Sequence, residues 1–233
     1  MRSYLIVDDN IELAENLAEI VEAEGASVLP VGGAAAALEA VRGQRFDSVL
    51  TDMRMPVANG AQLVHQLRAI DPGLPACVMT AYTADDDLVI ARHEGLLAIF
   101  GKPVPIEALL RTLAAARRDG LVALIEDDLA LSDNLSELLR ERGFGVVTAG
   151  SVTETDRLGP IRPFAAVVDL RVPEGPDGEA LRRFAQRFPD VPRLVITAHH
   201  DPLELASKDR VFQKPFDTGE VLKEVEALHG ARR

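Results

Sequence analysis

One stretch occurs twice in this chain, as LIVDDNIELAENLAEIVEAEGASV at residues 5–28 and as ALIEDDLALSDNLSELLRERGFGV at residues 123–146. The two copies align without a gap. In each copy a short apolar run ends at an acidic pair and is followed by apolar residues at helical spacing. The spaced residues are Leu13, Leu17, Ile20 and Val21 in the first copy, and Leu131, Leu135, Leu138 and Leu139 in the second. Later blocks also repeat: DMRMP at residues 52–56 matches DLRVP at residues 169–173. The chain is therefore predicted to be a duplication of one domain.

Within the first copy, short apolar strands alternate with helical patterns. The expected strands are Tyr4–Val7, Val28–Val31, Ser48–Thr51, Ala76–Thr80 and Ala98–Phe100. Helical spacing follows Gly60 and Pro105, and five such units with apolar strands predict a parallel sheet covered on both faces. The fold class is therefore α/β, with two flavodoxin-like, doubly wound five-stranded parallel sheets in tandem. We expect the domains at residues 1–118 and 121–233. Only Asp119-Gly120 separates them, which is too short for a flexible tether, so we expect the domains to be held close.

Composition narrows the classes of function. Hydrophobic residues make up 47% of the 233 residues and charged residues 27%, which is typical of a soluble globular protein. The formal net charge of −12 argues against nucleic acid and anionic membranes as partners, and no apolar run is long enough to span a membrane. The single cysteine, Cys77, lies in an apolar run and excludes an internal disulfide. We expect it to be a buried thiol of a cytoplasmic protein.

Polar side chains follow four of the five expected strands in each copy. Because the carboxyl ends of parallel strands meet at one edge of the sheet, we expect these side chains to share a crevice at the topological switch point. A single acidic residue after a strand is usually a helix cap or a loop charge, but five coincident positions in both copies point to a site. They are Asp8, Asp9, Asp52, Thr80 and Lys102 in the first copy, and Glu126, Asp127, Asp169, Thr197 and Lys214 in the second.

The residue types indicate phosphoryl chemistry. Carboxylates in one crevice repel, each pair at about 4 Å costing roughly 4 kcal/mol at an effective dielectric constant near 20. Such a site needs a cation, and oxygen ligands favour Mg²⁺, with Mn²⁺ as a substitute. A carboxylate can attack phosphorus to give an aspartyl phosphate. A lysine ammonium and a threonine hydroxyl can then stabilise the phosphoryl oxygens.

These motifs resemble the CheY-like receiver domains of two-component response regulators, twice over and across nearly the whole chain. The resemblance implies that Asp52 is the phosphoacceptor, with Asp8, Asp9 and the Arg54 carbonyl around the metal, and that Thr80 and Lys102 contact the phosphoryl group. In the second copy the corresponding residues are Asp169, Glu126, Asp127, the carbonyl of Arg171, Thr197 and Lys214, and a commonly cis proline follows each lysine. The resemblance further implies phosphorylation by a histidine kinase or histidine phosphotransfer protein, and output through an unidentified protein target. We expect no output domain, and the sequence leaves open whether the chain forms a homodimer.

Some positions depart from the family pattern. Receivers usually carry an aromatic residue three positions before the lysine, where this chain has Ile99 and Val211. Phe100 and Phe212 lie one position later, which on a strand points to the opposite face, so we expect them in the core. The second copy is five residues shorter between its threonine and its lysine, which predicts a shortened fourth helix, and its second helix near residues 152–160 is weak.

Three other functions share features with this pattern. A haloacid-dehalogenase-type phosphatase also forms an aspartyl phosphate, but it needs a second aspartate where this chain has Arg54 and Arg171. A flavin-binding electron carrier shares the fold class, yet its phosphate loop would be repelled by Asp8 and Asp9. The chain is therefore expected to be a phosphoacceptor, and not an enzyme beyond its own phosphorylation and dephosphorylation. The alternative is that only the first receiver is phosphorylated and the second is an interaction or dimerisation scaffold.

Overall fold

The computed structural model describes residues 1–56, 58–81, 95–156, 158, 161–198 and 209–232. These residues form two compact units. The first unit consists of Met1–Asp119 with Glu141–Gly145, and the second of Gly120–Arg140 with Val146–Arg233. Among the described residues, no helix is both long and apolar enough to cross a membrane.

The first unit contains a five-stranded parallel sheet with the strand order β2-β1-β3-β4-β5. This is the order of flavodoxin-like sheets, in which the switch point lies between the first and third strands. Each strand begins and ends within one residue of its expected bounds. The strands are β1 Ser3–Val7, β2 Ser27–Val31, β3 Ser48–Asp52, β4 Ala76–Thr80 and β5 Ala98–Gly101.

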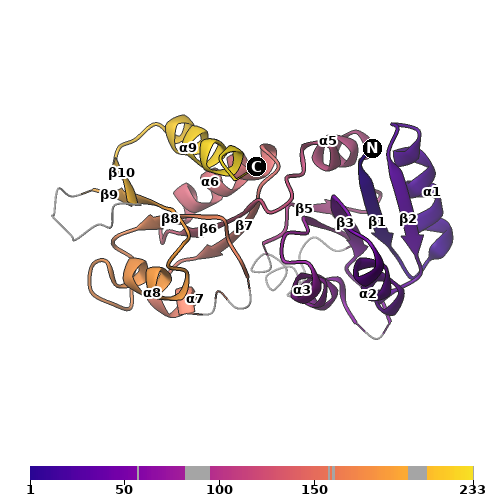
Figure 1. Cartoon of the computed structure of the whole chain (residues 1–233), viewed down its shortest axis with the longest axis horizontal. Coiled ribbons are helices and arrows are strands. Elements are labelled where there is room, and N and C mark those ends of the chain that lie inside the picture. Colours follow the sequence, from indigo (N-terminus) through magenta and orange to yellow (C-terminus); the bar gives the residue numbers. More distant parts are fainter. Residues whose placement is uncertain (57, 82–94, 157, 159–160, 199–208, 233) are drawn as a thin grey trace. The chain divides into compact units, whose positions relative to one another are not determined.

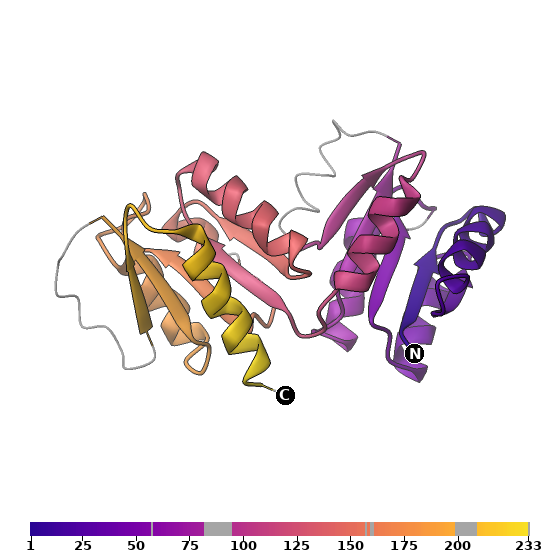
Figure 2. The ribbon, with the colours of Figure 1, turned by 90° about the horizontal axis from the view of Figure 1, so that it is seen from above.

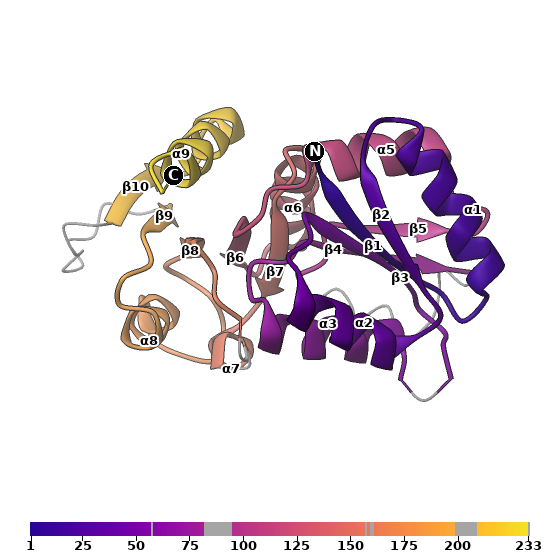
Figure 3. The same ribbon diagram turned by 45° about the vertical axis from the view of Figure 1, so that its right-hand side comes forward.

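Helices cover both faces of this sheet, α2 and α3 on one and α1 and α5 on the other (Figures 1 and 3). The alternation along β1 explains the two layers, because successive side chains of a strand point to opposite faces. Leu5 and Val7 pack in the cluster that holds α2 and α3, whereas Tyr4 and Ile6 pack with α1 and α5. The helices are α1 Ile11–Glu22, α2 Ala34–Gly43, α3 Gly60–Ile70 and α5 Ile106–Ala115.

The second unit repeats this architecture, with its sheet in the order β10-β9-β8-β6-β7 when read from the opposite edge. Helices α6 and α9 lie side by side along one face of the sheet (Figures 1 and 2), and α7 and α8 lie on the other. The strands are β6 Leu121–Ile125, β7 Gly145–Ala149, β8 Ala165–Asp169, β9 Arg193–Thr197 and β10 Asp209–Gln213. The helices are α6 Leu129–Glu141, α7 Val152–Asp156, α8 Glu179–Arg187 and α9 Thr218–Gly230. The expected fold class is confirmed.

The buried face of α1 differs from the predicted stripe. Leu17 and Val21 are buried as expected, but Ile20 is 38% exposed. The face is completed by two alanines, Ala14 and Ala18, which let the helix approach the sheet closely. In α6, Ser132 and Ser136 take the places of these alanines. The apolar spacing therefore located the helix correctly. The buried face, however, is rotated toward Ala14 and Ala18 and away from Ile20.

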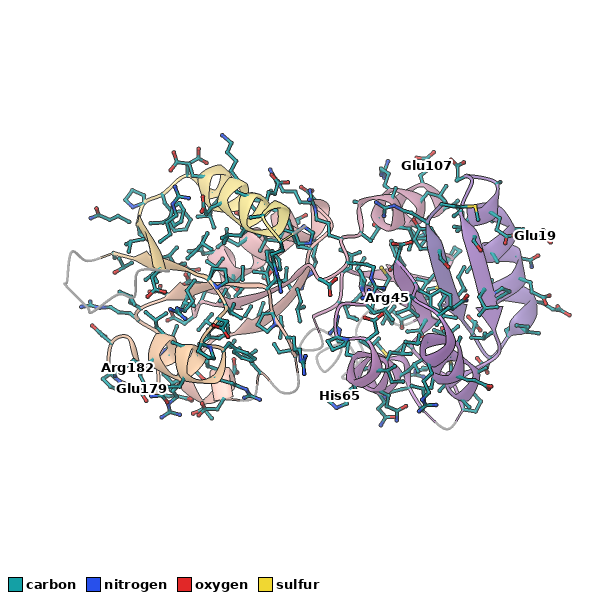
Figure 4. The ribbon with its side chains drawn as sticks, viewed as in Figure 1. Glu19, Arg45, His65, Glu107, Glu179 and Arg182 are labelled. Carbon is teal, nitrogen blue, oxygen red and sulfur yellow. The ribbon has the colours of Figure 1, made fainter. Side chains whose placement is uncertain are left out.

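The helices of the first unit carry charge on their outer faces. Glu19 on α1 and Glu107 on α5 point away from the sheet (Figure 4), and both are exposed. Cys77, in contrast, is completely buried on β4, which confirms the expected core thiol. Burial raises the pKa of the Cys77 thiol to about 12, so the thiol stays protonated at neutral pH.

The second unit departs from the first where the sequence was weak. Helix α7 has only 5 residues against 10 in α2, which confirms the weak second helix. Phe100 is buried as expected, but the expectation for Phe212 is wrong, because this side chain on the edge strand β10 is only half-buried. Val211 beside it is 47% exposed. The predicted shortened fourth helix falls at residues 199–208 and lies outside the described residues.

Candidate functional site

The first site lies at the carboxyl ends of β1 and β3. Asp8 follows β1 and Asp52 is the last residue of β3, and both are buried, with 1% and 5% exposed. Backbone N–H groups hold the two carboxylates: that of Asn10 donates to Asp8 Oδ1 at 2.9 Å, and that of Arg54 donates to Asp52 Oδ2 at 2.9 Å. Asp9, which directly follows Asp8, is exposed. Two carboxylate groups are thus fixed at the buried strand ends, with a third at the surface.

Lys102 brings a positive charge between the two buried carboxylates. Its Nζ lies 2.9 Å from Asp8 Oδ2 and 2.6 Å from Asp52 Oδ1. The backbone positions it, because the Lys102 N–H donates to the carbonyl of Thr80 at 2.7 Å, and a cis peptide bond to Pro103 follows. Thr80 ends β4 and is 1% exposed, so its hydroxyl belongs to the same buried strand ends.

The second site, at the carboxyl ends of β6, β8 and β9, has the same arrangement. Lys214 Nζ lies 2.9 Å from Glu126 Oε2 and 2.6 Å from Asp169 Oδ2. The N–H of Lys214 donates to the carbonyl of Thr197 at 2.7 Å, and the bond from Lys214 to Pro215 is cis. The N–H of Arg171 donates to Asp169 Oδ1 at 2.9 Å. The duplication is therefore preserved in atomic contacts as well as in sequence.

The ionisation of these groups reflects burial and pairing. Burial by itself would lower the pKa of Lys102, but hydrogen bonds to Asp52 and Asp8 outweigh it, so the pKa of Lys102 is raised. The pKa of Lys214 is raised by the same balance, because burial would lower it but hydrogen bonds to Asp169 and Glu126 outweigh that effect. For Glu126, burial raises the pKa, and the hydrogen bond from Lys214 only partly opposes it. Both lysines therefore remain charged and act as the counter-ions of the carboxylates.

The donor atoms suit a small divalent cation. In the second site, carboxylate oxygens of Glu126, Asp127 and Asp169 come within 4.8 Å of one another. Within the part of the chain that the structure describes, this is the one group of three such side chains. Three hard oxygen ligands with an exposed member leave room for water, as Mg²⁺ requires.

Several contacts at these sites were not anticipated from the sequence. The side chain of Asn10 caps α1 by accepting from the Leu13 N–H at 3.3 Å, and Asp128 accepts from Ala130 and Leu131 at the start of α6. Cap residues directly after the acidic pair are a signal that could have been read. Gly60 lies close to the acceptor loop, the backbone that follows Asp52. A Cβ added to Gly60 would stand 2.5 Å from the Asp52 carbonyl oxygen. That approach has no signal in the local sequence.

Arg54 and Arg171 each follow a phosphoacceptor candidate by two residues. Their backbone N–H groups hold the acceptor carboxylates, as described above. The side chain of Arg171 turns to Asp177, with Nε 2.8 Å from Asp177 Oδ2. The predicted role of the two arginine carbonyls as metal ligands stays a prediction.

Comparison with known proteins agrees with the geometry. The sequence-family model of the response regulator receiver domain matches residues 4–114. A response regulator receiver protein of Anaeromyxobacter sp. (strain Fw109-5) is 57% identical over 232 residues, covering 100% of this chain and 97% of its own length. The probable transcriptional regulatory protein TcrX of Mycobacterium tuberculosis is 34% identical over 145 residues, or 59% of this chain and 62% of its own.

Solved structures of receiver domains are similar to about half of the chain. A CheY-like receiver domain protein from Methanospirillum hungatei covers 49% of this chain and 91% of its own, with 26% identity and a TM-score of 0.47. The receiver domain of a sensor histidine kinase from Pseudomonas aeruginosa, with magnesium in its active-site cleft, covers 48% of this chain and 93% of its own, with 25% identity and a TM-score of 0.45.

The strand-end carboxylates and the full-length relative together identify the class: the chain belongs to the response regulator receiver family. Members of this family act in two-component signalling, are phosphorylated by histidine kinases or phosphotransfer proteins, and bind Mg²⁺ in the active site.

Proposed function

We propose that this chain accepts phosphoryl groups on Asp52 and on Asp169 and signals through contacts with a protein target. The supporting observation is that a lysine ammonium lies within 2.9 Å of two strand-end carboxylates in each unit. In both units one of these carboxylates is the proposed acceptor. The donor would be a phosphohistidine of a histidine kinase or histidine phosphotransfer protein. The chain would meet these partners in the cytoplasm.

In the proposed transfer, a carboxylate oxygen of Asp52 forms a bond to phosphorus while the bond from phosphorus to the histidine nitrogen breaks. The electron pair of the broken bond stays on the imidazole. Lys102 already contacts Asp52 and would remain beside the phosphoryl oxygens as their counter-ion. The Thr80 hydroxyl would donate a hydrogen bond to one of these oxygens. Asp169, Lys214 and Thr197 would take the same roles in the second unit.

A divalent cation completes both proposed sites. Asp8, Asp9, Asp52 and the Arg54 carbonyl would hold it in the first site, and Glu126, Asp127, Asp169 and the Arg171 carbonyl in the second. When bound, Mg²⁺ would neutralise part of the charge on the phosphoryl oxygens. Backbone N–H groups hold Asp8 and Asp52 in the first unit and Glu126 and Asp169 in the second. The three carboxylates of the second site already lie within 4.8 Å of one another, whereas Asp9 would have to move toward Asp8 and Asp52.

Intact mass spectrometry after treatment with acetyl phosphate and Mg²⁺ tests the proposal. We expect up to two added phosphoryl groups on the wild-type chain. Asp52→Asn should remove one of them and Asp169→Asn the other, because the amide is a poor nucleophile. Asp133→Asn, which changes an exposed aspartate on α6, is the matched control and should leave both groups in place. Phosphorylation of the Asp52→Asn/Asp169→Asn double variant would contradict the assignment.

A second candidate concerns the second unit alone, as a scaffold that is not phosphorylated. Two features favour it: α7 is a single short turn of helix, and Val211 on the edge strand is 47% exposed. These features change the face beside the site and leave the site itself intact. The same mass spectra separate the two candidates. A single phosphoryl group that always disappears with Asp52→Asn would support the scaffold.

A further inference from the structure

The mouth of the second site holds an ion pair that the proposed phosphoryl chemistry does not use. Arg171 Nε donates to Asp177 Oδ2 at 2.8 Å, and the two side chains are 47% and 55% exposed. The backbone N–H of the same arginine holds the Asp169 carboxylate at 2.9 Å. Arg171 thus contacts the proposed acceptor through its backbone, while its guanidinium is paired with a carboxylate six residues further along the chain.

The first site has a neutral residue at the corresponding place. In each unit a glycine N–H donates to the carbonyl of the residue after the acceptor, from Gly60 to Met53 at 2.8 Å and from Gly178 to Leu170 at 2.7 Å. The residue before that glycine is Asn59 in the first unit and Asp177 in the second. The Asn59 side chain caps α3 by accepting from the Gln62 N–H at 2.8 Å. At this aligned position the second unit thus carries a carboxylate where the first carries a neutral amide.

Phosphorylation would change the charge balance around this arginine. A phosphoryl group brings roughly −1.5 to −2 charges and three strong acceptor oxygens. Guanidinium groups bind such oxygens well, because their donors form a planar fork. Asp169 and Arg171 are two residues apart on one loop, so a phosphoryl group on Asp169 and the carboxylate of Asp177 would attract the same guanidinium.

We propose that Asp177 is a positioning residue that competes with the phosphoryl group for Arg171, and so weakens phosphoryl binding at the second site. This inference rests on the proposed function of Asp169 as an acceptor. Removal of the Asp177 charge releases Arg171 to the phosphoryl oxygens. In the wild-type chain, the phosphoryl oxygens at the second site consequently receive weaker contacts from Arg171 than they would without Asp177.

Beryllofluoride, which mimics a phosphoryl group on aspartate, provides the test. We would titrate it with Mg²⁺ into the full chain carrying Asp52→Asn, so that only the second site binds, and follow the bound signal by ¹⁹F NMR. Asp177→Asn should tighten binding about two- to fivefold, the range expected for a half-exposed ion pair. The effect should shrink at high salt, because the competition is electrostatic. Asp133→Asn is the control and should bind as its parent does.

A double-mutant cycle separates competition from a merely structural role. With Arg171→Ala in place, Asp177→Asn should have no further effect on binding, because the contested group is gone. An equal gain with and without Arg171, or no gain at all, would overturn the inference. If the Asp52→Asn chain binds no beryllofluoride, the proposed acceptor role of the second site fails and this inference fails with it, and that result is distinct from unchanged affinity.

Discussion

At the scale of single residues, the site is defined by acidic and basic side chains that pair at buried strand ends. Asp8 and Asp52 are almost fully buried, and Lys102 lies within 2.9 Å of both. An unpaired buried carboxylate would lose its hydration without compensation. The lysine therefore supports the folded state of the metal-free protein as well as the proposed chemistry. The pairing recurs in the second unit, although there the first acid is a glutamate.

Close approach of the backbone matters at this scale as well. In a Gly60→Ala variant the new Cβ would meet the Asp52 carbonyl oxygen at 2.5 Å and the Met53 Cα at 3.0 Å. Both are backbone atoms, so the acceptor loop must move, and we expect a loss of about 1–3 kcal/mol in the free energy of unfolding. Urea denaturation would measure it. In a chain that also carries Asp169→Asn, so that only the first site binds, Gly60→Ala should weaken beryllofluoride binding as well.

Gly43→Ala is the matched control, because an added Cβ at the end of α2 meets nothing within 4 Å. It should leave the free energy of unfolding unchanged or raise it slightly, since alanine restricts the unfolded chain. Equal losses for the two alanine variants would mean that the close approach at Gly60 has no special weight.

At the scale of elements, the edge strands of the two units are held differently. In the second unit, the Nε of Arg193 on β9 donates to Asp209 Oδ1 on β10 at 2.5 Å, and the side chains are 4% and 3% exposed. Ala76 and Leu97 stand at the corresponding places of the first unit, four residues before the ends of the paired strands. The second unit thus has a buried ion pair at positions where the first has two apolar residues, and this pair links β10 to β9.

Arg193→Ala should destabilise the second unit strongly. The change leaves the carboxylate of Asp209 buried without the guanidinium that faces it, which costs about 3–5 kcal/mol. Chemical denaturation would measure the loss. Arg193→Ala/Asp209→Leu, which copies the residue types of the first unit, should recover most of it, because neither member of the buried ion pair remains.

An exposed ion pair serves as the comparison. Glu179 and Arg182 lie together on the outer side of α8 (Figure 4), with a contact of 2.7 Å. Arg182→Ala should cost at most about 1 kcal/mol, since water already solvates both groups. If Arg193→Ala were as mild as Arg182→Ala, the buried pair would not be what anchors β10.

At the scale of the whole molecule, the chain between the repeats belongs structurally to the first unit. Arg118 Nη2 donates to both carboxylate oxygens of Asp71, at 2.8 and 2.6 Å. The Asp119 N–H donates to the Gly73 carbonyl at 2.9 Å. The second unit then begins at Gly120 and enters β6 at Leu121. These bonds leave no free spacer before the second repeat.

Metal binding should be visible in the stability of the entire chain. Mg²⁺ is expected to bind the folded sites and not the unfolded chain, so it should raise the melting temperature. At a concentration 100 times the dissociation constant, the gain is about 2.7 kcal/mol per site. Differential scanning calorimetry with and without Mg²⁺ would measure the shift.

The Asp52→Asn/Asp169→Asn variant is the control for this experiment. It removes one proposed ligand from each site and should show a much smaller shift. Ca²⁺-free buffers and constant ionic strength exclude general salt effects. A shift of the same size in the double variant would place the bound metal elsewhere on the protein.

The sequence by itself determined the duplication, the strands and the residues at the strand ends. These follow from local patterns, because apolar runs and helical spacing depend on neighbours only a few positions away. The burial of Cys77 and Phe100 was predictable for the same reason, whereas the half-buried state of Phe212 was not. Both phenylalanines lie on edge strands, where the burial of a side chain depends on how much of it other elements cover.

Only the tertiary structure decided which of these side chains meet. Lys102 reaches Asp8 across 94 positions of sequence, and it does so because the order and twist of the strands bring their carboxyl ends together. The rotation of α1 onto its alanines, the close approach at Gly60 and the pairing of Arg171 with Asp177 depend on the same long-range packing. Distances between segments come from how the whole sheet assembles, and no local pattern contains them.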